Sequence, residues 1–213
     1  TIKYPVGKFF CSTFILFSVI INSCDKNYNN RGGLTMAKDH TIYILLTYSG
    51  SLLSKCINIY TKEPYTHVSI ALDADLRELY SFGRIKPSNP VFGGFVKEDI
   101  INGTYARFPE TRCRVYSLRL KDTQYKRLEK ELNKFKKNRD KYGYNLLGLF
   151  GVVFNMPIER RYNYFCSQFV ASLLDSSGIE LFHKPPSLTS PRDFRKCKEL
   201  NLIYEGRLKR YGA

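Results

Sequence analysis

Residues 164–174 read YFCSQFVASLL, a run of mostly apolar side chains in which Cys166 comes third. The pattern predicts a buried helix over 164–176, with Gly178 just beyond its end. If Asn163 caps this helix, Cys166 falls in the first turn, where unpaired backbone N–H groups and the helix dipole favour a thiolate. A thiolate is a nucleophile, and the same N–H groups can hold the oxyanion formed by its attack on a carbonyl group. Simple burial is the alternative, because cysteine is one of the most buried residue types.

A candidate base for this cysteine lies in a second motif, residues 66–72, which read THVSIAL. Their alternation predicts a half-buried strand that begins at His67, and residues 78–82 predict a second strand that completes a hairpin. A histidine at a strand edge is held by a rigid element and can accept a proton from a thiol. His40 and His183 are less well placed, since one precedes the first predicted strand and the other precedes two prolines in an expected loop.

The rest of the chain predicts a domain of the α+β class. Residues 83–103 hold four glycines and two prolines, so we expect a long loop there. A short helix over 52–60 is expected to be capped by Ser49 or Ser51. The expected strands cover 41–48, 67–72, 78–82, 104–108, 113–120 and 201–208; the expected helices cover 52–60, 122–139, 144–154 and 164–176, with one further turn after Ser190.

Composition limits the classes of partner and site. The chain has 213 residues, of which 43% are hydrophobic, and 34 Lys and Arg against 19 Asp and Glu give a net charge of +15. This charge favours acidic partners such as an anionic membrane or a polyanionic cell-wall polymer. Nucleic acid is not expected, because the basic residues follow no known nucleic-acid-binding module. The six cysteines lack metal-ligand spacing, so we expect no metal and no other cofactor.

Residues 1–35 differ from the remainder of the chain. Two lysines precede an apolar run over 9–21, which has the length of a signal-peptide core and is shorter than the roughly 20 residues of a spanning helix. Cys24 ends a sequence that loosely resembles a lipoprotein cleavage box. Under this interpretation the protein is membrane-anchored or secreted through residues 1–24. Alternatively, translation starts at Met36, the preceding residues are not native, and the protein is cytoplasmic.

The two motifs together resemble the NlpC-type cysteine peptidase superfamily. They are most similar to its circularly permuted branch, in which the histidine strand precedes the cysteine helix. This branch includes bacterial relatives of cell-wall hydrolases and the lecithin:retinol acyltransferase-like enzymes. The resemblance covers about residues 41–175 and implies that 36–213 form a permuted papain-like domain. In such a core Cys166 opens a helix that packs on a small antiparallel sheet, and His67 is the base.

The resemblance also implies a third polar residue, which orients the imidazole. In the family it is a histidine or another polar residue, and it follows the histidine strand. This chain offers Ser81, Tyr80 and Glu78. The spacing from His67 favours Ser81 and Tyr80, whereas Glu78 would be the stronger orienting group. Four further residues are expected to border the substrate: Tyr48, Ser49, Tyr144 and Ser167.

The activity implied by the resemblance is hydrolysis of an amide bond through a thioester intermediate, in a peptide, an isopeptide or a cell-wall-type substrate. Acyl transfer or lipid-ester hydrolysis is the first alternative, in which the basic helix at 122–141 would contact an anionic membrane. The second alternative is an inactive binding module that keeps the fold.

Overall fold

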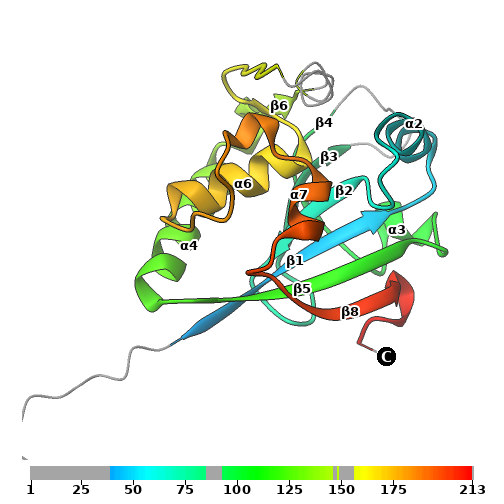
Figure 1. The fold of residues 1–213 in the computed structure, drawn as a ribbon, viewed down its shortest axis with the longest axis horizontal. Coiled ribbons are helices and arrows are strands. Elements are labelled where there is room, and N and C mark those ends of the chain that lie inside the picture. The colour runs from blue at the N-terminus through cyan, green and yellow to red at the C-terminus, as the bar shows by residue number, and fades with distance from the viewer. Residues whose placement is uncertain (1–38, 85–92, 146–147, 149–155, 213) are drawn as a thin grey trace, which may run out of the picture. The chain divides into compact units, whose positions relative to one another are not determined.

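A six-stranded antiparallel sheet organises the computed structural model, which describes residues 39–84, 93–145, 148 and 156–212 (Figure 1). The strand order is β4-β3-β2-β1-β5-β8, so that strands distant in sequence become neighbours at β1–β5 and β5–β8. The strands are β1 (His40–Tyr48), β2 (His67–Ala71), β3 (Leu79–Arg84), β4 (Gly93–Glu98), β5 (Arg112–Leu120) and β8 (Asn201–Arg207).

Helices cover this sheet, and a small parallel pair of strands forms a separate sheet that packs beside β4. Together they place the described residues in the α+β class, as predicted. The helices are α2 (Leu52–Thr61), α3 (Gly103–Ala106), α4 (Asp122–Lys137), α6 (Cys166–Ser176) and α7 (Pro191–Lys196), and the parallel pair is β6 (Gly143–Tyr144) with β7 (Asn163–Tyr164). Short 3₁₀ turns are Arg139–Lys141, Pro186–Leu188 and Leu208–Arg210.

Several local predictions are confirmed by specific contacts. Ser51 is the N-cap of α2, and its side chain accepts from the backbone N–H of Ser54. Ser190 caps α7 in a capping box with Asp193. Gly178 adopts a φ of +74° directly after the cap of α6, a conformation that glycine adopts at little cost.

Two predicted elements are wrong. The expected loop over 83–103 contains β4 and the end of β3, because Gly93 and Gly94 pair with β3 as strand residues. A Cβ atom on Gly93 would lie 2.9 Å from Tyr144, so this glycine permits close packing and does not break the strand. The expected strand at 104–108 is the one-turn helix α3, which follows the positive φ of Gly103.

Other predictions fall partly or wholly outside the described residues. Tyr144 belongs to β6, while 146–147 and 149–155 of the expected helix at 144–154 are not described. The signal-like extension at 1–35 is also outside the described part. Within the described residues, no helix combines the length and apolar character needed to cross a bilayer.

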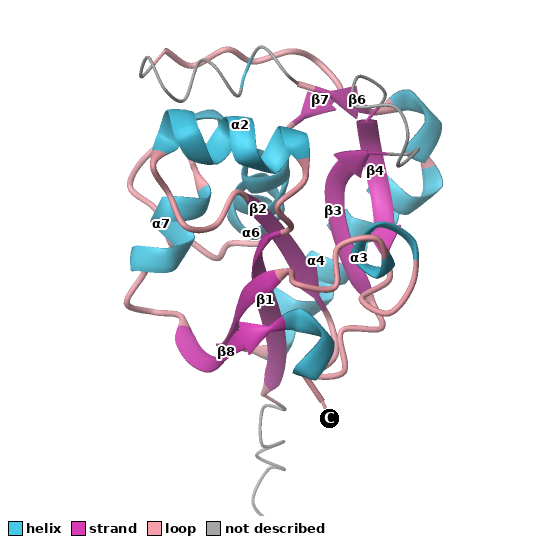
Figure 2. Ribbon diagram, turned by 90° about the vertical axis from the view of Figure 1, so that its right-hand side faces the viewer, coloured by secondary structure: helices cyan, strands magenta, loops and turns pink. Residues whose placement is uncertain are grey.

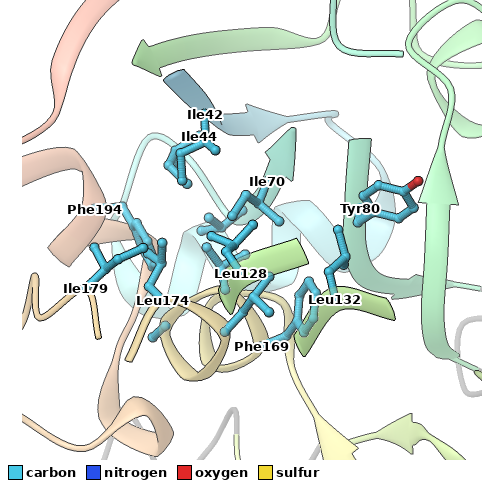
Figure 3. Packing of buried hydrophobic residues seen from close by; sticks show 14 of the residues in the cluster. Ile42, Ile44, Ile70, Tyr80, Leu128, Leu132, Phe169, Leu174, Ile179 and Phe194 are labelled. Carbon is cyan, nitrogen blue, oxygen red and sulfur yellow. The ribbon is translucent and has the colours of Figure 1, made fainter. Parts of the chain in front are cut away.

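The hydrophobic core lies between one face of the sheet and the helices α4 and α6 (Figure 3). Alternation along β2 directs Val68 and Ile70 into this core, and α4 contributes Leu128 and Leu132. Phe169 of α6 packs within the same cluster. Burying one such side chain contributes about 1.5–3 kcal/mol, so α6 is fixed firmly against the sheet.

Leu128→Ala should lower the free energy of unfolding by about 2–5 kcal/mol, because it leaves a cavity at a fully buried position between α4 and the sheet. Urea denaturation measures this change. Lys130→Ala, at an exposed position on the same helix, is the matched control and should change stability by less than about 0.5 kcal/mol. Equal effects of the two substitutions would contradict this placement of α4.

Candidate active site

Glu98, the last residue of β4, lies at the centre of a cluster of polar side chains. Its Oε1 accepts hydrogen bonds from Ser81 Oγ at 2.6 Å and from His67 Nε2 at 2.7 Å. Its Oε2 accepts from Ser69 Oγ at 2.7 Å and from Tyr105 OH at 3.1 Å. A carboxylate has about four acceptor positions, so these donors satisfy the group completely.

Strand alternation brings these side chains to one face of the sheet. His67 and Ser69 point away from the helices that cover Val68 and Ile70, since successive residues face opposite sides. The neighbouring strands β3 and β4 contribute Ser81 and Glu98, and α3 supplies Tyr105 (Figure 2). The cluster therefore depends on the pairing of three strands and on the turn that carries α3.

His67 is hydrogen-bonded on two sides. Nε2 meets Glu98, and a second hydrogen bond joins the ring to Cys166, for which Nδ1 is the remaining nitrogen. Burial by itself would lower the pKa of His67, but the negative charges of Glu98 and Cys166 outweigh it and raise this pKa well above its ordinary value. The imidazolium form is therefore the stable one at neutral pH.

Cys166 is the first residue of α6, as the sequence predicted, although the cap differs. Phe165 is the N-cap, whereas Asn163 lies in β7 and its side chain donates to the carbonyl oxygen of Arg161. Burial works to raise the pKa of Cys166, but the charge and hydrogen bond of His67 and the backbone N–H groups of Val68 and Ser167 lower it. The thiolate is thus favoured chiefly by His67, and the N-terminus of α6 adds the backbone N–H of Ser167.

The pKa of Glu98 is lowered, so the carboxylate is the charged form beside the His67 imidazolium. Burial would raise it, but the charge of His67 and the hydrogen bonds from His67, Ser81 and Ser69 lower it to about 2. The Glu98 carboxylate, the His67 imidazolium and the Cys166 thiolate therefore form a series of alternating charges, which we call the charge chain. In chemical terms, this arrangement provides a nucleophile, a group that can give and take a proton, and a residue that orients it.

A cleft of about 400 Å³ adjoins this cluster. His67, Glu98 and Tyr105 lie in its wall, together with Ser49 and Tyr144, two of the expected substrate-binding residues. Cys166 is only 3% exposed and is not among the residues of the wall, whereas 23% of the His67 side chain is exposed. Of the two side chains, the imidazole is therefore the one that borders the cleft.

The three residues expected to orient His67 lie in different places. Ser81 donates to Glu98 and so acts on the imidazole indirectly. Tyr80 faces the opposite side of the sheet, where its ring stacks on Phe95 and its hydroxyl donates to Glu78. Glu78 is paired with Lys97 and Lys136. The direct partner of His67 is therefore Glu98, which the sequence analysis did not consider.

The other expected residues divide similarly. Tyr48 lines a second pocket and not this cleft. The Ser167 side chain is fully buried and donates to the carbonyl oxygen of Thr189 at 2.7 Å, so its backbone N–H is the group that faces the sulfur. Of the alternative histidines, His40 pairs with Asp122 and His183 is exposed to solvent.

The sequence did not indicate Glu98, because the glycines and prolines of residues 83–103 predicted a loop where β4 lies. The apolar pair Phe95 and Val96, directly before Lys97 and Glu98, is the one local signal of a half-buried strand there. Among the described residues, no group of three or more His, Cys, Asp or Glu side chains is arranged to hold a metal ion.

Alkylation of Cys166 by iodoacetamide should titrate with a midpoint below the ordinary thiol pKa of about 8.5. Glu98→Gln removes the charge that stabilises the His67 imidazolium, so the pKa of His67 falls, the pKa of Cys166 rises and the midpoint moves to higher pH. Mass spectrometry of the Cys166 peptide measures both midpoints. Cys197, whose pKa burial raises to about 11, is the internal reference. An unchanged midpoint in Glu98→Gln would contradict the charge chain.

Ser81→Ala distinguishes a supporting residue from a direct orienting residue. It removes one of the four donors to Glu98 but leaves the bond between Glu98 and His67 in place. The same titration should therefore show a smaller shift for Ser81→Ala than for Glu98→Gln. A larger shift for Ser81→Ala would mean that Ser81 controls the imidazole itself.

Comparison of the chain with protein-family models and with curated proteins gives no match. The juxtaposition of Cys166, His67 and Glu98 is therefore the strongest indication of what the protein does.

Proposed function

We propose that this protein is a cysteine hydrolase that cleaves an amide bond through a thioester intermediate. One observation carries the proposal: Cys166, His67 and Glu98 form a continuous hydrogen-bonded series at the start of a helix. Structural ion pairs also shift pKa values, but here the shifts favour the charged forms that nucleophilic catalysis requires. A buried cysteine with a purely structural role needs neither an imidazole nor a carboxylate behind it.

The residues divide the reaction as follows. The Cys166 thiolate attacks the carbonyl carbon, and the resulting oxyanion is held by backbone N–H groups of the first turn of α6. His67 then gives its Nδ1 proton to the departing amine, and the C–N bond breaks to leave a thioester. Neutral His67 next takes a proton from water, whose oxygen attacks the thioester. The acid leaves, and the thiolate and imidazolium are restored.

A permuted papain-like core is the fold that we propose for this chemistry. Two features support it: β2, which bears His67, precedes α6 in the chain, and α6 packs directly on β2 and β3. The antiparallel sheet continues beyond the hairpin to β4, whose Glu98 accepts a hydrogen bond from His67. A glutamate is among the residues that orient the imidazole in the family that the two motifs resemble.

Intact-protein mass spectrometry after treatment with a thiol-reactive probe, such as an acyloxymethyl ketone, tests whether Cys166 is the nucleophile. Wild type should gain one adduct at Cys166, and Cys166→Ser should lose it. Cys197→Ser is the matched control, because this half-buried cysteine lies outside the charge chain and its removal should leave the labelling unchanged. Labelling of Cys166→Ser at the wild-type rate would exclude Cys166 as the nucleophile.

Turnover identifies the reaction. A panel should contain peptide amides, γ-glutamyl isopeptides, acyl thioesters and phospholipids. We expect amide cleavage, lost in Cys166→Ser and His67→Ala, and a kcat lower by about 10²–10⁴-fold in Glu98→Gln, by analogy with the loss of the carboxylate in a serine triad. Turnover of phospholipid in place of amides would favour the acyltransferase alternative. Labelling without turnover of any kind would favour the binding module.

A further inference from the structure

A second pocket, of about 570 Å³, lies where β1 ends, β5 begins and β8 ends. Figure 1 shows how these three strands lie next to one another in the sheet. It is dominated by arginine, with one glutamate as the acidic residue in its wall. The charged residues of the wall are Arg112, Arg114, Arg195, Arg207 and Glu205. The candidate active site uses none of them.

Strand register places two of these arginines directly opposite each other. Arg112 of β5 pairs with Arg207 of β8, and like charges at such a position destabilise a sheet. Arg207 has a partner in Glu110 at 2.8 Å, whereas the Arg112 side chain forms no ion pair or hydrogen bond to the described residues. Both side chains are exposed to solvent, which screens much of this repulsion, and an anion between the two guanidinium groups would remove the rest.

The neighbouring carboxylates are too few to neutralise the pocket. Glu205 pairs with Arg114, while Glu63 and Glu110 are each shared by two cations. Of the four arginines in the wall, Arg114, Arg195 and Arg207 each have a carboxylate partner and Arg112 has none among the described residues. Because Glu63 and Glu110 also pair with Arg192 and Lys209, they neutralise the wall only in part.

The kind of anion follows from the donors. Guanidinium groups arrive from β5, β8 and α7, so they approach from several directions and each presents paired N–H donors. A phosphate group matches this set better than a carboxylate, because it carries up to two charges and offers oxygens in a tetrahedral arrangement. We propose that this arginine pocket binds a phosphate group.

The arginine pocket is distinct from the active-site cleft, although both adjoin the same two segments. Thr47 lines the cleft, and the next residue, Tyr48, lines the arginine pocket. Similarly, Thr66 lines the cleft, and the preceding residue, Tyr65, lines the arginine pocket. Thr47 and Tyr48 are consecutive residues of β1 and point to opposite faces of the sheet, so the two cavities lie on opposite sides of this strand end. Phosphate binding therefore goes beyond the proposed hydrolase activity and does not require Cys166.

Calorimetric titration with inorganic phosphate, at constant ionic strength in chloride buffer, tests the proposal. Arg112→Gln/Arg207→Gln should bind phosphate about tenfold more weakly or worse, since it removes two charged donors. Arg119→Gln removes the same charge from an exposed position on β5 and should change affinity by less than about twofold. Cys166→Ser should bind as wild type does, which separates this site from the hydrolase proposal.

Folding and the source of the phosphate are checked in parallel. Arg112→Gln relieves the like-charge contact, so its melting temperature should equal or exceed that of wild type. This single variant therefore provides a folded protein for the binding measurement.

Vesicles of phosphatidylcholine with phosphatidic acid, compared with equally charged phosphatidylserine vesicles, distinguish a lipid headgroup from a soluble phosphate compound. Arginine-dependent retention on phosphatidic acid that inorganic phosphate competes away supports the lipid source; phosphate binding without retention supports the soluble one. No binding beyond that of chloride, or equal binding by the double variant, would overturn the proposal.

Discussion

The buried carboxylate of Glu98 is the constraint on which the candidate site depends. A buried charge costs several kcal/mol unless it is paired and hydrogen-bonded, so the fold must supply donors to both oxygens. It does so from β2, β3 and α3, through His67, Ser69, Ser81 and Tyr105. Because these donors come from separate segments, the same network that satisfies Glu98 also fixes the orientation of the imidazole.

The polar network around Glu98 lies on one face of the sheet. The other face carries apolar side chains that pack against α4 and α6, while the face with the network also holds a smaller apolar cluster that includes Leu45, Leu79 and Val115. His67 is the first residue of β2, an interior strand, and its ring interacts with Glu98 on one side and with Cys166, at the N-terminus of α6, on the other. Packing of α6 on the sheet thus places the sulfur, and the network behind the imidazole sets its charge.

The arginine pocket follows from the same geometry with different residues. Where β1 and β8 end and β5 begins, the helix-facing positions are occupied by Tyr48, Arg207 and Arg112, in place of the apolar side chains that fill the centre of the sheet. The basic composition of the chain is therefore not spread evenly as a solvated surface. Part of it is gathered at one end of the sheet, beside the segments that also border the active-site cleft.

The sequence by itself determined the elements whose signals are local. Alternation located β2, the apolar period located α6, and the position of Cys166 at a helix start followed from its immediate neighbours. The tertiary structure alone decided which carboxylate supports His67 and which arginines face each other. Glu98 is 31 residues from His67 along the chain, and Arg207 is further still from Arg112. Such contacts depend on strand order and register, which arise from the packing of the whole sheet and leave no pattern in the residues nearby.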